Sequence, residues 1–183
     1  MSIKRGATYD DLLKVPDDKV AEIVDGELYA SPRPRIRHSR VGSLLGAEII
    51  DIFDRGLRGP GGWWILDEPE LHLGDDILVP DIAGWRRESL PSLPDTPAFT
   101  LAPDWVCEIL SPSTESLDRH HKLPAYARHG VSFLWLVDAS GKRLDVFRRD
   151  NGAWHHVESH RGDEQVYAEP FEAAAIDLAA IWA

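Results

Sequence analysis

The chain has 183 residues, a length that fits a single domain over residues 1–183. A domain of this size buries enough apolar surface to be stable without disulfides or structural metal ions. Its one cysteine, Cys107, excludes an internal disulfide and a cysteine-based zinc site. The net charge of -11 argues against a general nucleic-acid binder, because phosphate contacts need Lys and Arg, but it leaves room for a site whose carboxylates bind a divalent cation.

The N-terminal part of the chain predicts a short helix, a hairpin and a long helix. Residues 8–13 read as a helical turn with a threonine N-cap and acids behind it. Two strand-like runs, 20–24 and 27–30, flank Asp25-Gly26, which is a strong signal for a β-hairpin. Apolar residues then recur at helical spacing over residues 36–57 and end at glycines.

Strand-like runs dominate the rest of the chain. We expect strands at 63–66, 70–73, 77–85, 104–110, 133–137, 144–148 and 154–158. We expect a proline-rich surface loop over 87–104 between the third and fourth of these strands. A helix that ends at His129 should follow the fourth strand, and a short helix or an irregular segment should form the C-terminal part of the chain. This order predicts an α/β (α+β) fold, a mixed sheet with helices packed on it.

Two acids stand inside apolar segments, where a charge is costly. Taken alone, Asp81 after Pro80 is more often a solvated residue at a sheet margin, and Glu108 is equally well explained by a structural ion pair. Together they lie on consecutive strands, and neighbouring strands are ~4.8 Å apart, close enough for two carboxylates to chelate one ion. We therefore expect Asp81 and Glu108 to hold Mg (or Mn) for phosphodiester hydrolysis.

The helix after Glu108 offers a cation. Asp118, Lys122 and Tyr126 are spaced by four and share one helix face. An exposed Asp118–Lys122 salt bridge is the plain alternative to a Lys122 that points back towards Glu108. Pro124 implies that the helix either begins shortly before it or is kinked there.

One stretch of this acidic chain is locally basic. Within eight residues it holds Arg33, Arg35, Arg37 and Arg40, together with His38. We expect phosphate contact here, with an ordinary surface cluster as an equal alternative. The residues predicted to contact substrate are Arg35, Arg37, His38 and Tyr126.

Several of these residues together resemble the Uma-two-type bacterial family, restriction endonucleases of the PD-(D/E)XK superfamily. The resemblance covers residues 8–180, nearly the whole chain. Its motifs are Glu22 to Leu28, His38, Pro80-Asp81, Glu108, Ser111 to Thr114 and Lys122 to Val131. It implies a restriction-endonuclease-like fold, a mixed central sheet flanked by helices with extra antiparallel hairpins. It also implies a magnesium-dependent cleavage of DNA by Asp81, Glu108, Lys122 and Glu22.

The chain departs from the superfamily pattern at one position. That pattern has a lysine two residues after the second acid, where this chain has Leu110. The family supplies the lysine from the following helix, and Lys122 is the matching residue. Leu110 and the negative net charge keep open a second hypothesis, a catalytically silent nuclease-fold module that binds nucleic acid or protein. Binding of Mg through Asp81 and Glu108 distinguishes the two.

The sequence also bears on location and assembly. No stretch approaches ~18 apolar residues and no apolar run follows the start, so we expect a cytoplasmic protein without a membrane partner. DNA is the expected partner. A homodimer would place two basic stretches on one duplex and so compensate for the repulsion between DNA and the negatively charged protein.

Overall fold

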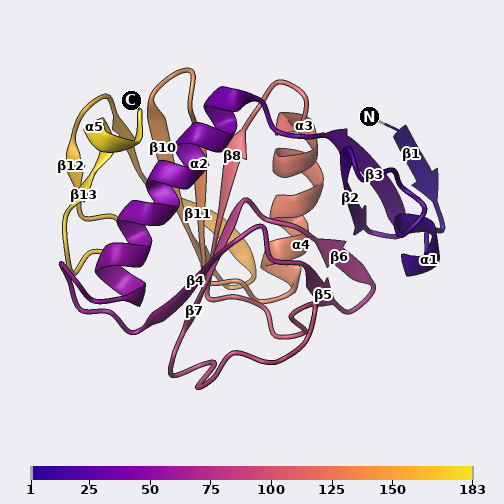
Figure 1. The fold of residues 1–183 in the computed structure, drawn as a ribbon, viewed down its shortest axis with the longest axis horizontal. Coiled ribbons are helices and arrows are strands. Elements are labelled where there is room, and N and C mark those ends of the chain that lie inside the picture. The colour runs from indigo at the N-terminus through magenta and orange to yellow at the C-terminus, as the bar shows by residue number, and fades with distance from the viewer. Residues whose placement is uncertain (1, 183) are drawn as a thin grey trace.

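A six-stranded mixed sheet forms the centre of the molecule, in a computed structural model that describes residues 2–182 (Figure 1). Its spatial order is β11-β10-β9-β8-β7-β4, and only the β8–β9 pair is parallel among these described strands. The strands are β4 (Trp63–Asp67), β7 (Ile82–Arg86), β8 (Trp105–Leu110), β9 (Phe133–Asp138), β10 (Arg143–Asp150) and β11 (Ala153–Arg161). The predicted mixed sheet is confirmed.

A five-stranded antiparallel sheet lies at one end of the molecule (Figure 1). It runs β1 (Ser2–Arg5), β3 (Glu27–Pro32), β2 (Lys19–Val24), β6 (Asp76–Leu78) and β5 (Leu71–Leu73), and a further pair joins β12 (Gln165–Val166) to β13 (Ile176–Asp177). At the β2–β3 turn, Asp25 and Gly26 have φ of 52° and 72°, the left-handed values that this tight hairpin turn requires. The predicted hairpin is confirmed, whereas β1 was not predicted.

Helices cover both faces of the central sheet. They are α1 (Tyr9–Leu12), α2 (Ile36–Ile49), α3 (Glu115–Leu117), α4 (Leu123–Arg128) and α5 (Leu178–Ile181), with π-helical turns η1 (Ile50–Asp54) and η2 (Asp118–Lys122). Alternate residues of β8 serve two separate cores: Cys107 packs in the core of α2, and Val106 in that of α4. No helix within residues 2–182 has the length and apolar character needed to cross a bilayer.

The strand expected over 77–85 is wrong, because the chain breaks it at residues 79–81. Pro80 has no N–H to donate to a ladder, so a continuous strand cannot pass through it. On one side of the break, β6 pairs with β2 in the five-stranded sheet; on the other, β7 pairs with β4 and β8. Residues 79–81 therefore cross from one sheet to the other, and Asp81 lies at the junction.

The helix predicted to end at His129 is confirmed, with an irregularity that accommodates its proline. Helical segments follow one another from Glu115 to Arg128, and Pro124 lies in the first turn of α4, directly after η2. A proline inside an α-helix clashes with the carbonyl four residues earlier. The wider π turn, with its i→i+5 bonds, occupies that place and keeps the helix running past the proline.

Candidate active site

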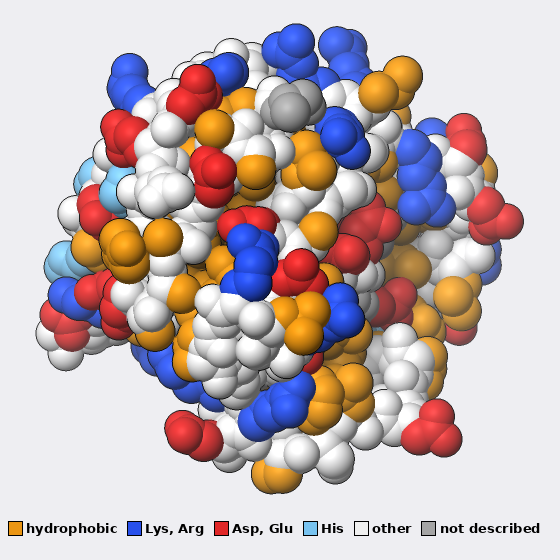
Figure 2. Space-filling view, turned by 60° about the vertical axis from the view of Figure 1, so that its left-hand side comes forward, with side chains coloured by type: hydrophobic (Ala, Val, Ile, Leu, Met, Phe, Trp, Pro, Cys, Tyr) orange, Lys and Arg blue, Asp and Glu red, His pale blue; other side chains and the backbone are white. Residues whose placement is uncertain are grey.

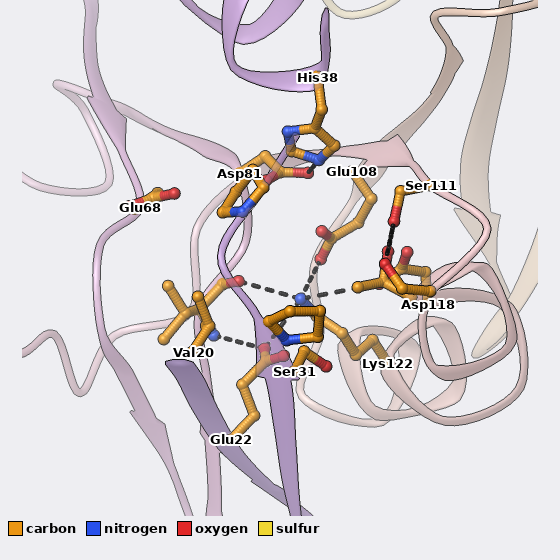
Figure 3. A pocket seen from close by; sticks show the side chains of 15 residues that line it. Val20, Glu22, Ser31, His38, Glu68, Asp81, Glu108, Ser111, Asp118 and Lys122 are labelled. Carbon is orange, nitrogen blue, oxygen red and sulfur yellow. Dashed lines mark hydrogen bonds and ion pairs between the residues drawn. The ribbon is translucent and has the colours of Figure 1, made fainter. Parts of the chain in front are cut away.

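The junction of the two sheets encloses a cavity of about 50 Å³ (Figure 3). Ile82 pairs with Cys107 across β7 and β8, so Asp81 and Glu108 come next to each other at the end of that ladder. Both side chains line the cavity, together with Glu22 from β2, His38 from α2, and Asp118 and Lys122 from η2. A second cavity of about 160 Å³ adjoins it and shares His38 and Asp81 in its lining.

Lys122 is the centre of the polar contacts. Its Nζ lies 2.8 Å from Glu22 Oε1 and 2.9 Å from Glu108 Oε1, and it donates to the carbonyl of Val79 at 3.0 Å (Figure 3). Asp118 Oδ1 is farther, at 4.0 Å. An ammonium group has three protons. Three acceptors within 3.0 Å therefore use the full donor capacity of a side chain that is only 3% exposed.

Asp81 is held through one of its two oxygens. Its Oδ2 accepts the backbone N–H of Ile109 at 2.6 Å and lies 3.3 Å from His38 Nε2. Burial, the largest single influence, lowers the pKa of His38, but the hydrogen bond and charge of Asp81, together with the Ile109 backbone and the charge of Asp118, outweigh it and the pKa is raised. Among the side chains of residues 5–182 and the backbone of residues 2–182, no group bonds to Asp81 Oδ1, so this oxygen is available to a ligand.

The two glutamates follow the same pattern. Glu22 Oε1 accepts the backbone N–H of Val79 at 2.8 Å as well as Lys122. Glu108 Oε1 accepts the Tyr126 hydroxyl at 2.6 Å as well as Lys122. Neither Oε2 receives a hydrogen bond from the described chain. Each of the predicted acids is thus fixed by one oxygen and presents the other.

The cavity carries an excess of negative charge. Five carboxylates line it, from Glu22, Glu68, Asp81, Glu108 and Asp118, against the single lysine. Burial raises the pKa of Glu108 well above its ordinary value, opposed by Lys122 and reinforced by the other acids. Burial likewise raises the pKa of Asp118 to about 7. Acids crowded in this way favour an additional cation.

The donor set fits a divalent ion only in part. Among residues 2–182, no three His, Cys, Asp or Glu side chains are arranged as a metal-binding cluster, and the ammonium of Lys122 lies between Glu22 and Glu108. Magnesium, however, prefers one or two carboxylates and completes its shell with water and phosphate oxygens. Asp81 and Glu108, each with one open oxygen, fit such a site.

The predicted substrate contacts separate in space. His38 turns into the cavity, whereas Arg35 and Arg37 are exposed. Arg37 and Arg40 line a different groove of about 460 Å³ together with Lys142. Figure 2 shows Lys and Arg side chains along the upper edge of one face of the molecule and others scattered over its middle and lower part. Basic groups are therefore available near α2, but outside the cavity that holds the acids.

Tyr126 lies behind the cavity. It is fully buried, and its hydroxyl donates to Glu108. From this position it orients the carboxylate and does not line the cavity itself.

Asp118, Ser31 and Glu68 are among the lining residues that were not proposed from the sequence as site residues. Asp118 had a visible signal, its spacing of four from Lys122, which was explained as a helix face. Ser31 and Glu68 had no local signal, because their places depend on how distant segments meet. Glu68 has a φ of 46°, uncommon for a residue with a side chain.

Comparisons with known proteins point to one group. The model of the Uma2 family, described as "putative restriction endonuclease", matches residues 7–180. A crystal structure titled as a putative nuclease belonging to DUF820 from Anabaena variabilis superposes with a TM-score of 0.74 and is 23% identical. The alignment covers 96% of this chain and 97% of that one, so the likeness extends over the whole fold. No curated protein matches the chain.

Proposed function

This chain belongs to the Uma2 family, and on that premise we propose that it is a metal-dependent endonuclease that hydrolyses DNA phosphodiester bonds. One observation carries the proposal. Asp81, Glu108 and Glu22 converge on one cavity beside a buried lysine, and each acid is fixed through one oxygen while the other is open. A purely structural ion-pair cluster would not need to leave these oxygens free.

Asp81 and Glu108 would hold the ion, Mg or Mn. When bound, such an ion activates water at neutral pH and stabilises negative charge on a phosphoryl oxygen. His38 and the Ile109 amide keep Asp81 in place, and Tyr126 does the same for Glu108. These contacts keep both carboxylates oriented before substrate arrives.

Lys122 would stabilise the charge that develops on the phosphate. Its three protons are all engaged within the protein, so contact with substrate requires the exchange of one acceptor. The neutral carbonyl of Val79 is the weakest of the three partners and the one we expect to be given up. Glu22, fixed by the Val79 amide, would then keep the ammonium near the phosphate.

The test is a plasmid-cleavage assay with Mg²⁺ or Mn²⁺, run with the parent protein and with Asp81→Asn. Cleavage by the parent that disappears with EDTA and with the isosteric variant supports the proposal. Absence of cleavage by the parent with either metal and several DNA substrates would reject it.

A catalytically silent module of the same fold is the second candidate. The engaged protons of Lys122 and the absence of a preformed three-ligand cluster within residues 2–182 favour it. Absence of both metal binding and cleavage would support the silent module. Isothermal titration with Mn²⁺, with Asp81→Asn as the control, measures that binding independently of activity.

A further inference from the structure

The hydroxyl of Ser31 is buried in the candidate active site without a hydrogen-bond partner. The residue is 4% exposed, and its Oγ contacts no donor or acceptor of the chain that the structure describes. It nevertheless lines the same cavity as Asp81 and Glu108. An unsatisfied buried hydroxyl opposes folding, and an apolar residue of similar size would avoid that cost. A buried hydroxyl without a partner in a polar cavity therefore indicates that a bound ligand supplies its hydrogen-bond partner.

The strand register explains why Ser31 faces the cavity. Ser31 on β3 lies opposite Val20 on β2, and Tyr29 lies opposite Glu22. Side chains two residues apart share a face, so these four point to the same side of the sheet. That side faces η2, and Figure 3 shows Ser31 beside Glu22 and Lys122 at one end of the cavity, with Asp81 and His38 at the other.

The other donors that line the cavity are already engaged. Lys122 uses its three protons on Glu22, Glu108 and Val79. The hydroxyl of Ser111 bonds with those of Ser113 at 2.9 Å and Thr114 at 3.0 Å, and Thr114 also bonds with Asp118. His38 faces Asp81. Of the lining residues that the structure describes, Ser31 thus carries the uncommitted hydroxyl.

We propose that Ser31 Oγ donates a hydrogen bond to a nonbridging oxygen of the substrate phosphodiester and positions it beside Lys122. This rests on the proposed endonuclease function. A phosphate that enters this acidic cavity meets the repulsion of five carboxylates, so it needs donors that those acids do not occupy. A neutral O–H next to a buried ammonium supplies one at the end of the cavity opposite Asp81.

The test compares Ser31→Ala with the parent on a fluorescently labelled DNA duplex with Mg²⁺. We expect KM to rise about threefold to tenfold, the effect of one neutral hydrogen bond. The melting temperature should stay equal or rise slightly, because the variant removes an unsatisfied group. Ser31→Thr, which keeps the hydroxyl, should restore most of the affinity. Ser89→Ala is the matched control, since that hydroxyl is exposed and bonded to Asp104 at a distance from the site.

An unchanged KM in Ser31→Ala would overturn the proposal, whether the hydroxyl is then idle or holds an ordered water. If the melting temperature also falls while KM is unchanged, Ser31 has a structural role only. Fluorescence anisotropy of the duplex with Ca²⁺ in place of Mg²⁺ measures binding without turnover. If the parent cuts no DNA, the endonuclease proposal fails, and this binding comparison alone decides the role of Ser31.

Discussion

Replacement of Lys122 by methionine is the most direct test of the way this site is held together. The substitution keeps an unbranched side chain, one atom shorter, and removes the ammonium that bonds Glu22, Glu108 and Val79 at 2.8, 2.9 and 3.0 Å. Removing one partner from a buried ion pair leaves uncompensated charge and costs about 3–5 kcal/mol. For a chain of this length, each ~1 kcal/mol lowers the melting temperature by about 2–4 °C, so Lys122→Met should lose about 6–20 °C.

Calorimetry at neutral pH without metal measures this loss, with Lys142→Met as the matched control. Lys142 is half exposed and pairs at 3.2 Å with exposed Asp163, a contact worth about 0–1 kcal/mol. Added Mn²⁺ should restore part of the lost stability in Lys122→Met, since a divalent ion can compensate the acids that the lysine leaves behind. Equal melting temperatures for the two variants, or full nuclease activity in Lys122→Met, would refute the reasoning.

The remaining predictions concern the ion, pH and DNA. About 10 mM Mg²⁺ should stabilise the parent by about 1.4 kcal/mol for a site of ~1 mM affinity, and Asp81→Asn or Glu108→Gln should abolish that gain in thermal melts. The pKa of Asp118 is raised from 3.8 to about 7, so its contribution to stability is full below pH 3.8 and is lost as pH rises through about 7. That loss is at most about 4 kcal/mol, and Asp118→Asn should flatten it in metal-free melts; parallel curves for parent and variant would contradict this. Exchange of Arg37 and Arg40 for alanine should weaken duplex binding and reduce its salt dependence in anisotropy titrations while Mn²⁺ affinity stays unchanged; equal binding would make the groove an ordinary surface.

Local patterns predicted the elements that carry the site. The Asp25-Gly26 turn, the apolar strand around Glu108 and the helix before Gly130 all depend on neighbours in sequence, and each is present. Spacing by four also placed Lys122 and Tyr126 on one helix face, and both contact Glu108. These sequence patterns predict local structure correctly because the interactions that determine it involve residues only a few positions apart.

Long-range pairing could not be predicted in the same way. Pro80 was visible in the sequence as a residue that disrupts a strand. The sequence did not show that β6 would pair with β2 while β7 paired with β4 and β8. Ser31 enters the site only through its register opposite Val20 and through the closeness of η2. The basic stretch looked continuous in sequence, yet helix geometry directs His38 to the acids and Arg37 to another groove.

The position of the lysine follows from the alternation along β8. Residues 106, 108 and 110 share one face of the strand, and Leu110 there packs with the core of α4 instead of presenting a charge. The helical segment that covers this face brings Lys122 within 2.9 Å of Glu108, so the cation reaches the acid from above the sheet and not along the strand. The π turn at Asp118–Lys122 precedes Pro124 directly, and an α-helical turn in its place would rotate Lys122 relative to the proline-fixed α4. The irregular turn and the departure at Leu110 are therefore two parts of one arrangement, in which a helix supplies the charge that the strand lacks.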